Sequence, residues 1–302
     1  MKRVFKILLI ASVPMIWSFQ SFGFSFSPND VSTLKHQIVL NGNEATAESD
    51  STKFTAHLEI LGPKDQQLGV CTGIIVEKDI LLTAGHCFAI DGVEKVRVHF
   101  GIGGESGFSD SVDTTDYTFW HQKGSEFRNE YADIAQGYEG EKRKEFFNVA
   151  KFGIPAVWRF TDFAVIRIPK IPSGYRPIKI YEGKIDFRQA VVVAGHGINT
   201  LDRKKASYSL RWSNGEVIGH YTLNGDSTMG WQIFYPDKKP ICQGDSGGPL
   251  LIFDKTEYKL LGINIFGNEP CDTASWALDI LYEKAAIQEA IKDLRKHATN
   301  QI

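Results

Sequence analysis

Ser246 is the residue of this chain whose surroundings are most typical of catalysis. It lies in the glycine-dense string Cys242-Gln243-Gly244-Asp245-Ser246-Gly247-Gly248-Pro249, just before an apolar segment typical of a strand. A hydroxyl is a weak nucleophile at its free pKa, so a catalytic serine needs a positioned base and donors that stabilise negative charge. Glycine accepts backbone conformations that other residues avoid and leaves N–H groups accessible. The string therefore predicts either a nucleophile or a plain glycine-rich turn, and a histidine and a carboxylate must decide between them.

One histidine and two aspartates are candidates for the remaining roles. His86 lies in the string Leu82-Thr83-Ala84-Gly85-His86-Cys87, and an imidazole titrates near neutrality, so it can take a proton from serine and return it to a leaving group. A carboxylate beside the imidazole would orient it and stabilise its charged form. Asp162 precedes the apolar run Phe163–Ile168, whereas a Gln-Gly pair soon interrupts the segment after Asp133. We therefore favour Asp162 over Asp133.

These strings resemble the signature motifs of the trypsin/chymotrypsin-like serine protease family. Gly244–Pro249 resembles the family's serine motif, the string around His86 its histidine motif, and Thr161–Ile168 its aspartate motif. The resemblance implies a secreted serine endopeptidase with a catalytic triad of His86, Asp162 and Ser246, in that chain order. It also implies an oxyanion hole formed by the backbone N–H groups of Gly244 and Ser246, with no metal and no cofactor.

The residues that the resemblance assigns to substrate recognition differ from those of a tryptic enzyme. The base of the primary pocket is Pro240, followed by Ile241, where an enzyme that cleaves after lysine or arginine would carry an aspartate. The adjoining wall is Ile265-Phe266-Gly267, in which Gly267 keeps the entrance open. Because the base has no charge, we expect protein or peptide substrates with a small or apolar residue before the cleaved bond.

The start of the mature domain also follows the family pattern, with one departure. Val39-Leu40-Asn41-Gly42, with Ala45 shortly after, fits the register of an N-terminus that is released by activation. The resemblance implies that the new ammonium group of Val39 pairs with Asp245, since a buried carboxylate needs a partner. Ile38 precedes the cut where the family often has a basic residue, so the activating protease is not evident. We expect a pro-segment over residues 24–38 and a protease domain over residues 39–302.

The first residues are typical of an export signal. Basic residues at positions 2, 3 and 6 precede an apolar run, Ile7–Trp17, which is shorter than the roughly 20 residues that span a membrane. We therefore expect a cleaved signal peptide over residues 1–23 rather than a membrane anchor, and a secreted or periplasmic protein. Disulfides persist in such compartments. Of the three connectivities that four cysteines allow, we favour Cys71–Cys87 and Cys242–Cys271.

The pattern between the motifs predicts an all-β fold. Short apolar or alternating segments separated by turn signals are typical of strands. They comprise Phe54–Leu61, Val70–Val76, Ile80–Thr83, Val96–Phe100, Phe163–Ile168, Ala190–Ala194, Arg211–Ile218, Trp231–Tyr235, Leu250–Phe253 and Lys259–Phe266. From Tyr282 apolar residues recur at helical spacing. We expect two six-stranded antiparallel β-barrels of the chymotrypsin type with a C-terminal α-helix, and an irregular insertion over about residues 101–156.

The composition of the chain and the order of its candidate catalytic residues disfavour several functional classes. A formal net charge of -2 gives no sign of nucleic-acid binding, and we expect a monomer with no membrane contact in its mature form. An α/β-hydrolase esterase would share the Gly-x-Ser-x-Gly string, but it needs the order Ser…Asp…His, and only His297 follows Ser246. A protease-fold binding protein without catalysis is the alternative from another class. His196, between two glycines, is predicted to be structural, and the other histidines receive no role.

Overall fold

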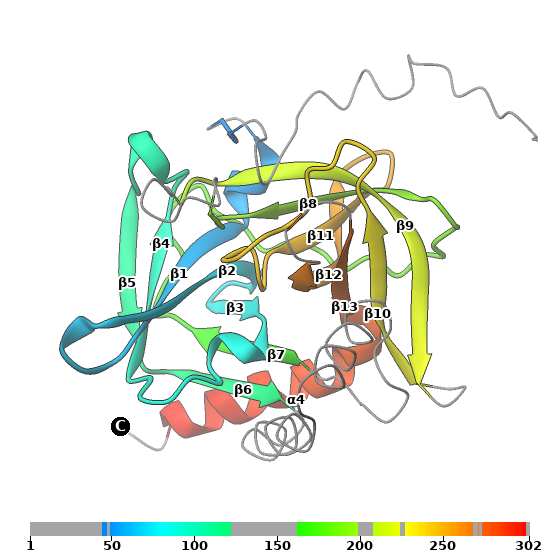
Figure 1. The fold of residues 1–302 in the computed structure, drawn as a ribbon. Coiled ribbons are helices and arrows are strands. Elements are labelled where there is room, and N and C mark those ends of the chain that lie inside the picture. Colours follow the sequence, from blue (N-terminus) through cyan, green and yellow to red (C-terminus); the bar gives the residue numbers. More distant parts are fainter. Residues whose placement is uncertain are drawn as a thin grey trace, which may run out of the picture. The chain divides into compact units, whose positions relative to one another are not determined.

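A computed structural model describes residues 44–46, 49–121, 162–198, 208–223, 227–267, 271 and 274–299, which all belong to the unit His36–Ile302. The predicted signal peptide and pro-segment lie outside these residues, as do Val39 and Asp133. The described part consists of two sheets, one long helix and four short 3₁₀ turns, η1 (Asp50–Lys53), η2 (Pro63–Asp65), η3 (Gly85–Cys87) and η4 (Gly104–Ser106) (Figure 1).

The first sheet contains seven antiparallel strands and is barrel-like. In spatial order they are β5 (Asp110–Thr114), β4 (Lys95–Phe100), β1 (Thr55–Leu61), β2 (Gln67–Glu77), β3 (Ile80–Thr83), β7 (Asp162–Arg167) and β6 (Tyr117–His121). Only two residues separate the edge strands β5 and β6 in sequence, so the two edges of the sheet must come together. The Thr114 hydroxyl donates to the Arg167 carbonyl at 2.9 Å across this junction. Alternate residues of β4 point into the core, including Val96 and Val98.

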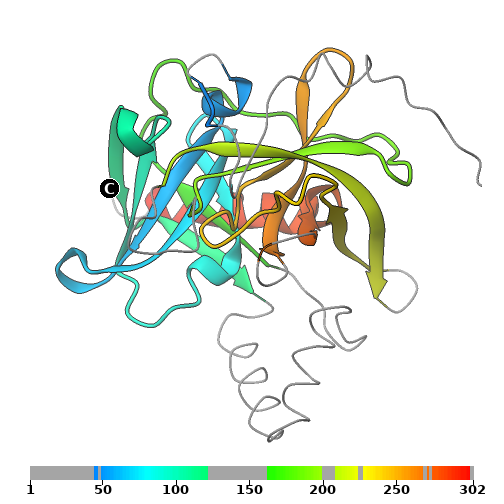
Figure 2. The same cartoon turned by 45° about the horizontal axis from the view of Figure 1, so that its top comes forward.

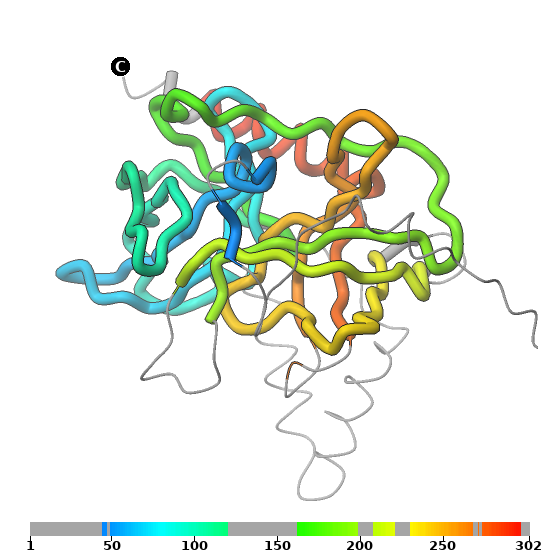
Figure 3. The backbone as a smooth tube through the Cα atoms, turned by 90° about the horizontal axis from the view of Figure 1, so that it is seen from above, coloured from blue at the N-terminus to red at the C-terminus, as the bar shows by residue number. Residues whose placement is uncertain are grey.

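The second sheet is a closed barrel of six antiparallel strands. They are β8 (Ala190–Gly195), β9 (Arg211–Leu223), β10 (Ser227–Phe234), β11 (Pro249–Phe253), β12 (Tyr258–Gly267) and β13 (Ala274–Asp279), in the spatial order β10-β13-β12-β11-β8-β9. Closure leaves no free sheet edge, and Val191, Val193, Ile233 and Leu250 pack together in its core. Figures 2 and 3 show the green, yellow and orange strands of this barrel beside the blue and cyan strands of the first sheet.

The C-terminal helix α4 (Ile280–Thr299) packs against both sheets. Asp279 caps it, because one carboxylate oxygen accepts from the N–H groups of Leu281 at 2.9 Å and Tyr282 at 3.2 Å. The apolar stripe predicted from the spacing is largely buried against β12, β6 and β7: Ile287, Ala290, Ile291 and Leu294 are buried, and Ala286 is partly buried. Helix α4 therefore joins the two halves of the fold along one side (Figure 1).

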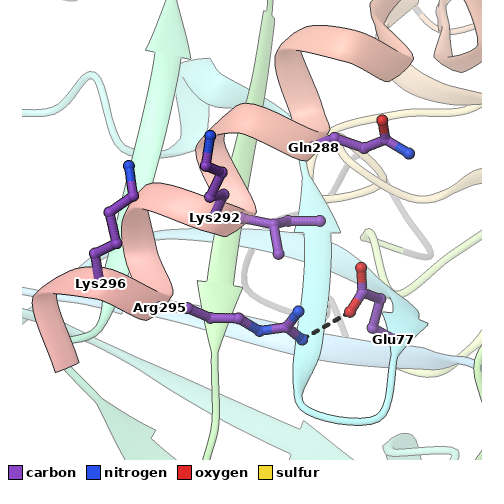
Figure 4. Close-up of a pocket in the computed structure, with 6 residues that line it drawn as sticks. Glu77, Gln288, Lys292, Arg295 and Lys296 are labelled. Atoms are coloured by element: carbon purple, nitrogen blue, oxygen red, sulfur yellow. Dashed lines mark hydrogen bonds and ion pairs between the residues drawn. The ribbon is translucent and has the colours of Figure 1, made fainter. Parts of the chain in front are cut away.

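Arg295 fastens the far end of α4 to the turn between β2 and β3. Its Nη2 lies 2.7 Å from Glu77 Oε2 and 2.8 Å from Asp79 Oδ1. Figure 4 shows Arg295 reaching from the helix towards Glu77. Together with Gln288, Ile291, Lys292 and Lys296, Arg295 and Glu77 line a hollow of about 370 Å³ that contains none of the predicted site residues.

The predicted fold class is confirmed, but the strand pattern differs in three places. The first sheet has seven strands rather than six, and β13 was not among the predicted strands. The expectation of an irregular segment over residues 101–156 is wrong for β5 and β6. β5 has one apolar residue, Val112, and is otherwise polar, so its local pattern carries no hydrophobic alternation. Its backbone bonds come from pairing with β4, which only the folded chain supplies.

Candidate active site

The pairing of β3 with β7 brings the predicted histidine and aspartate together. Thr83 on β3 pairs with Ala164 on β7, so the residues after β3 and the first residue of β7 lie at the same end of the sheet. His86, in η3, has its Nδ1 2.8 Å from Asp162 Oδ2, and its backbone N–H donates to Asp162 Oδ1 at 2.7 Å. Asp162 is 4% exposed, whereas the side chain of His86 keeps 37% of its exposure. The buried carboxylate of Asp162 thus holds His86 through both its ring and its backbone N–H, while the imidazole stays accessible.

Two opposing effects act on the pKa of His86. Burial lowers it, whereas the charge of Asp162 and the hydrogen bond to it raise it, and the net pKa lies above the ordinary value for histidine. The carboxylate at Nδ1 favours the neutral tautomer that carries its proton on Nδ1. Nε2 is then the ring atom that can accept a proton.

Two disulfides hold the loops that carry the candidate residues. Cys71–Cys87 fastens η3 to β2, and Cys242–Cys271 fastens the residues before Ser246 to the segment that follows β12. Both pairs are the ones that the sequence favoured. Each disulfide therefore limits the movement of one loop of the site relative to its sheet.

Residues 242–245 form a β-turn of type II immediately before Ser246. The Asp245 N–H donates to the Cys242 carbonyl at 3.1 Å, and Gly244 has a φ of 93°, which glycine adopts without strain. The Thr72 hydroxyl donates to the Gly244 carbonyl at 3.0 Å, and the Thr72 N–H donates to the Ser246 carbonyl at 2.8 Å. Within the described residues, the N–H groups of Gly244 and Ser246 donate to no acceptor. Both N–H groups are therefore available to a substrate oxygen.

Gly247 allows this turn to lie directly against the first sheet. Its φ is 80°, and a Cβ at this position would collide with the Thr83 hydroxyl and the Thr72 carbonyl. On the other side, its N–H donates at 2.7 Å to the carbonyl of Asn264 on β12. Ser246 is consequently held where the two sheets meet.

A cleft of about 480 Å³ lies over the candidate residues. His86, Gln243, Gly244 and Ser246 all line it, together with residues of β2, Ile90, Ile198 and Tyr208. The cleft thus combines an imidazole that can accept a proton, a serine hydroxyl and two unbonded N–H groups. This is the set of groups that acyl transfer to serine requires.

Asp245 belongs to the interior rather than to the cleft. It is fully buried, and its two carboxylate oxygens accept at 2.8 Å from the N–H groups of Gly197 and Cys242. Burial raises the pKa of Asp245 to about 7, although these two N–H groups act to lower it. Within the described part of the chain, no ion pair involves Asp245, and its predicted partner Val39 lies outside that part.

The predicted pocket residues lie together but do not line this cleft. Pro240, Ile241 and Ile265 are buried, and Phe266 stacks on Trp276 with ring centroids 4.6 Å apart. A Cβ at Gly267 would lie 2.9 Å from the Ile241 carbonyl oxygen, so the two predicted walls abut. An inserted side chain would therefore require the walls to separate.

Several residues that hold the serine turn carry no sequence signal. Thr72 bridges the turn and the segment after β8, because its hydroxyl also accepts from the His196 N–H at 2.9 Å. Gly197 donates to Asp245, and the Ile198 N–H donates to the Gln243 carbonyl at 2.9 Å. A threonine beside a cysteine or a glycine beside a histidine is too common a pattern to predict these contacts.

Two barrel-like sheets, a C-terminal helix and a His–Asp pair beside a serine turn are the architecture of chymotrypsin-like proteins. The family model described as Trypsin matches residues 39–281, and the chain belongs to this family.

Known proteins of this kind resemble the chain at low identity. Melanization protease 1 of Drosophila melanogaster is 24% identical over 257 residues, which are 79% of this chain and only 61% of that relative. A solved structure described as HL collagenase has a TM-score of 0.59 and 20% identity, over 84% of this chain and 99% of its own. Another, described as GrC, has a TM-score of 0.57 and 17% identity, over 84% of this chain and 100% of its own. At these identities the two structures show the shared fold.

Proposed function

We propose that this protein is a serine endopeptidase that hydrolyses peptide bonds through His86, Asp162 and Ser246. The observation that carries the proposal is the double hydrogen bond from His86 to Asp162, beside a cleft that His86 shares with Ser246. The match to the trypsin family over most of the chain supports it.

The proposed reaction proceeds through an acyl-enzyme. Ser246 Oγ attacks the peptide carbonyl while its proton passes to His86 Nε2, and Asp162 stabilises the imidazolium. His86 then gives the proton to the departing amine as the C–N bond breaks. A water molecule next attacks the ester, transfers a proton to His86, and releases the acid as the proton returns to Ser246.

The negative charge that develops on the substrate oxygen is stabilised by the N–H groups of Gly244 and Ser246. Two hydrogen bonds support this role: the Ile198 N–H donates to the Gln243 carbonyl, and the Gly248 N–H donates to the Asp245 carbonyl, each at 2.9 Å. These carbonyls belong to the same peptide groups as the N–H groups of Gly244 and Ser246, so both peptide groups are held before substrate arrives. Each such donor typically contributes on the order of 3 kcal/mol to lowering the barrier.

The primary specificity is non-tryptic. Pro240 and Ile241 at the predicted base are buried and uncharged, and the walls around Gly267 abut, which favours a small or apolar side chain before the cleaved bond. A lysine or arginine would enter a site without a compensating carboxylate, which is unfavourable.

The protein is made as an exported zymogen. Residues 1–23 act as signal peptide and residues 24–38 as pro-segment, and an activating protease cuts before Val39. The buried carboxylate of Asp245, whose raised pKa reflects burial, is suited to an ammonium partner such as the new N-terminus of Val39. Disulfides are consistent with an oxidising compartment outside the cytoplasm, where the enzyme acts as a monomer. No helix among the described residues is long and apolar enough to cross a membrane.

The test is mass spectrometry of the exported protein after treatment with a fluorophosphonate probe, beside a Ser246→Ala variant. We expect one adduct on Ser246 in the wild type and none in the variant, because only an activated serine reacts rapidly. The same spectra report whether the chain begins at Val39. Peptide-library cleavage then gives the preferred residue before the cut.

The outcomes separate the alternatives. Absence of an adduct on a chain that begins at Val39 would contradict catalysis and favour a protease-fold binding protein. Absence of an adduct on a chain that keeps residues 24–38 would indicate an unprocessed zymogen. Preferred cleavage after lysine or arginine would contradict the proposed specificity.

A further inference from the structure

Three histidines that are far apart in sequence lie together beneath the serine turn. His57 on β1 is directly opposite His99 on β4, and on its other side it is opposite Thr72 on β2. His196, which follows β8, lies edge-on to His57 with ring centroids 5.7 Å apart. Phe108 stacks on both His57 and His99, with centroids 5.1 Å and 4.7 Å apart. We call His57, His99 and His196 the histidine cluster.

Two rings of the histidine cluster are buried and the third, His99, is partly buried, with 15% of its side chain exposed. His57 is 1% exposed and His196 is fully buried. Among the described residues, no hydrogen-bond partner is present for His57 Nδ1, for His99 Nε2 or for either ring nitrogen of His196. Buried polar atoms without partners are costly and rare in folded proteins, so four ring nitrogens without partners in one place require an explanation. His57 and His99 stack on Phe108, His196 is tilted against it, and no group of three potential ligands in the described residues is arranged to hold a metal ion.

Little around His57 and His196 would compensate a positive charge. Burial holds the pKa of His57 well below its ordinary value, and burial lowers that of His196 to about 3, with the neighbouring imidazoles adding to both effects. Glu59 Oε2 lies 3.1 Å from His99 Nε2, in a geometry that makes no hydrogen bond, and Arg97 competes for this carboxylate at 3.9 Å.

The other charged or polar groups nearby face elsewhere. Asp245 is turned towards Gly197 and Cys242, and Arg211 is paired with Glu44 at 2.9 Å. The Tyr208 carbonyl favours a protonated His196, but burial outweighs this effect. His57 and His196 therefore pack in this arrangement only as neutral rings.

The segment that carries His196 also holds the serine turn. The His196 N–H donates to the Thr72 hydroxyl, which donates to the Gly244 carbonyl. The Gly197 N–H donates to Asp245, and the Ile198 N–H donates to Gln243. A movement of the His196 ring out of its site would strain the two direct bonds to Gln243 and Asp245 and the indirect link through Thr72 to Gly244.

We propose that the histidine cluster is an acid-sensitive latch for the serine turn. The latch is closed while its rings are neutral. Protonation of His57 and His196 favours an open state in which residues 195–198 leave the first sheet, and the N–H groups of Gly244 and Ser246 lose their fixed positions. The enzyme is thereby switched off reversibly in acid and on at neutral pH. The opening and closing of the latch depend only on contacts within the fold, so the test below does not require catalytic activity.

The direction of the pH dependence follows from proton linkage. In the open state a histidine has its ordinary pKa of about 6.5, so opening takes up protons as the pH falls below that value. One such histidine favours opening by about 25-fold between pH 7 and pH 5, and two favour it by about 600-fold. Asp245 acts in the opposite direction while its pKa is raised, because its neutral form stabilises the closed state. All the variants compared below keep Asp245, so its contribution cancels when their pH dependences are compared.

The test is amide hydrogen exchange of the full chain in a Ser246→Ala background, which prevents self-cleavage. Protection of residues 195–198 and 242–247 is measured at pH 7 and pH 5 and corrected for intrinsic exchange. We expect the acid-induced loss of protection to be about 25-fold smaller in His196→Phe or His57→Phe and about 600-fold smaller in the double variant. The matched control, His220→Asn, removes a histidine outside the cluster and should behave as the background chain does.

Equal loss of protection in the background chain and the double variant would overturn the latch. Imidazole NMR of the background chain provides a measurement that does not depend on whether the variants fold. We expect His57 and His196 to titrate only together with the loss of protection. Titration of either ring near its ordinary pKa while residues 195–198 stay protected would equally refute the proposal.

Discussion

Replacing Thr72 with valine should destabilise the fold and slow catalysis together. Thr72 is fully buried, and its hydroxyl donates to the Gly244 carbonyl and accepts from the His196 N–H. Valine keeps the branched shape but leaves both backbone groups without a partner. A buried group left unsatisfied costs about 1–3 kcal/mol. Because Gly244 borders the cleft and water can reach it, we expect the two losses to sum to about 2–4 kcal/mol in the free energy of unfolding.

The same substitution should reduce kcat/KM without touching the triad. The Thr72 hydroxyl holds the carbonyl of Gly244. This bond limits the rotation of Gly244, and such a rotation would redirect the Gly244 N–H. Complete loss of one oxyanion donor typically lowers kcat by about 10²–10³-fold. Partial displacement should therefore lower kcat/KM by about tenfold to a hundredfold.

Urea unfolding and peptide hydrolysis of Thr72→Val are to be compared with Thr55→Val. Thr55 is also buried, but its hydroxyl donates only to the nearby Ser51 carbonyl, at 2.7 Å, away from the cleft. Thr55→Val should cost about 1–2 kcal/mol and leave the rate per folded molecule unchanged. If Thr72→Val matches this control in both stability and rate, the turn keeps its conformation without the Thr72 hydroxyl, and the reasoning is wrong.

Three further predictions follow from the site. Asp162→Asn should lower kcat by about 10⁴-fold, because the amide stabilises the wrong tautomer of His86. The midpoint of thermal unfolding should change little. A loss of kcat under tenfold would contradict the role assigned to Asp162. Activity should rise with pH as His86 loses its proton, with a midpoint above the ordinary histidine pKa because Asp162 raises it, and a pH–rate profile of Asp162→Asn should show that midpoint moved to lower pH. The stability that the His86–Asp162 ion pair contributes depends on pH in the opposite direction to the activity. It is fully present below about pH 6.5 and is lost as the pH rises through the raised pKa of His86. Joint replacement of Cys71 and Cys87 by alanine should cost about 3 kcal/mol in urea unfolding, the value expected for closing a loop of this length, and an unchanged midpoint would refute that contribution.

Much of the fold and of the site was readable from the sequence because the relevant signals are local. The strings around His86, Asp162 and Ser246 are short and distinctive. The apolar runs predicted ten of the strands, seven of them to within one residue at each end, whereas β2, β9 and β10 each extend three to five residues beyond the prediction at one end. The apolar spacing after Tyr282 likewise predicted α4 and its buried stripe. The strands β5 and β6 were missed, because an edge strand with few buried residues takes its stability from its neighbour rather than from its own pattern.

The tertiary structure alone decided how these pieces meet. The register of Thr83 opposite Ala164 is what sets His86 beside Asp162, and no spacing along the chain encodes that distance. Thr72 contacts the serine turn because Gly247 removes the side chain that would keep the sheets apart. His57, His99 and His196 are far apart in sequence and form one cluster only when β1, β4 and the end of β8 are brought together. Local sequence determines which groups are present and which elements form, whereas burial, pKa and hydrogen-bonding partners depend on residues that are distant along the chain.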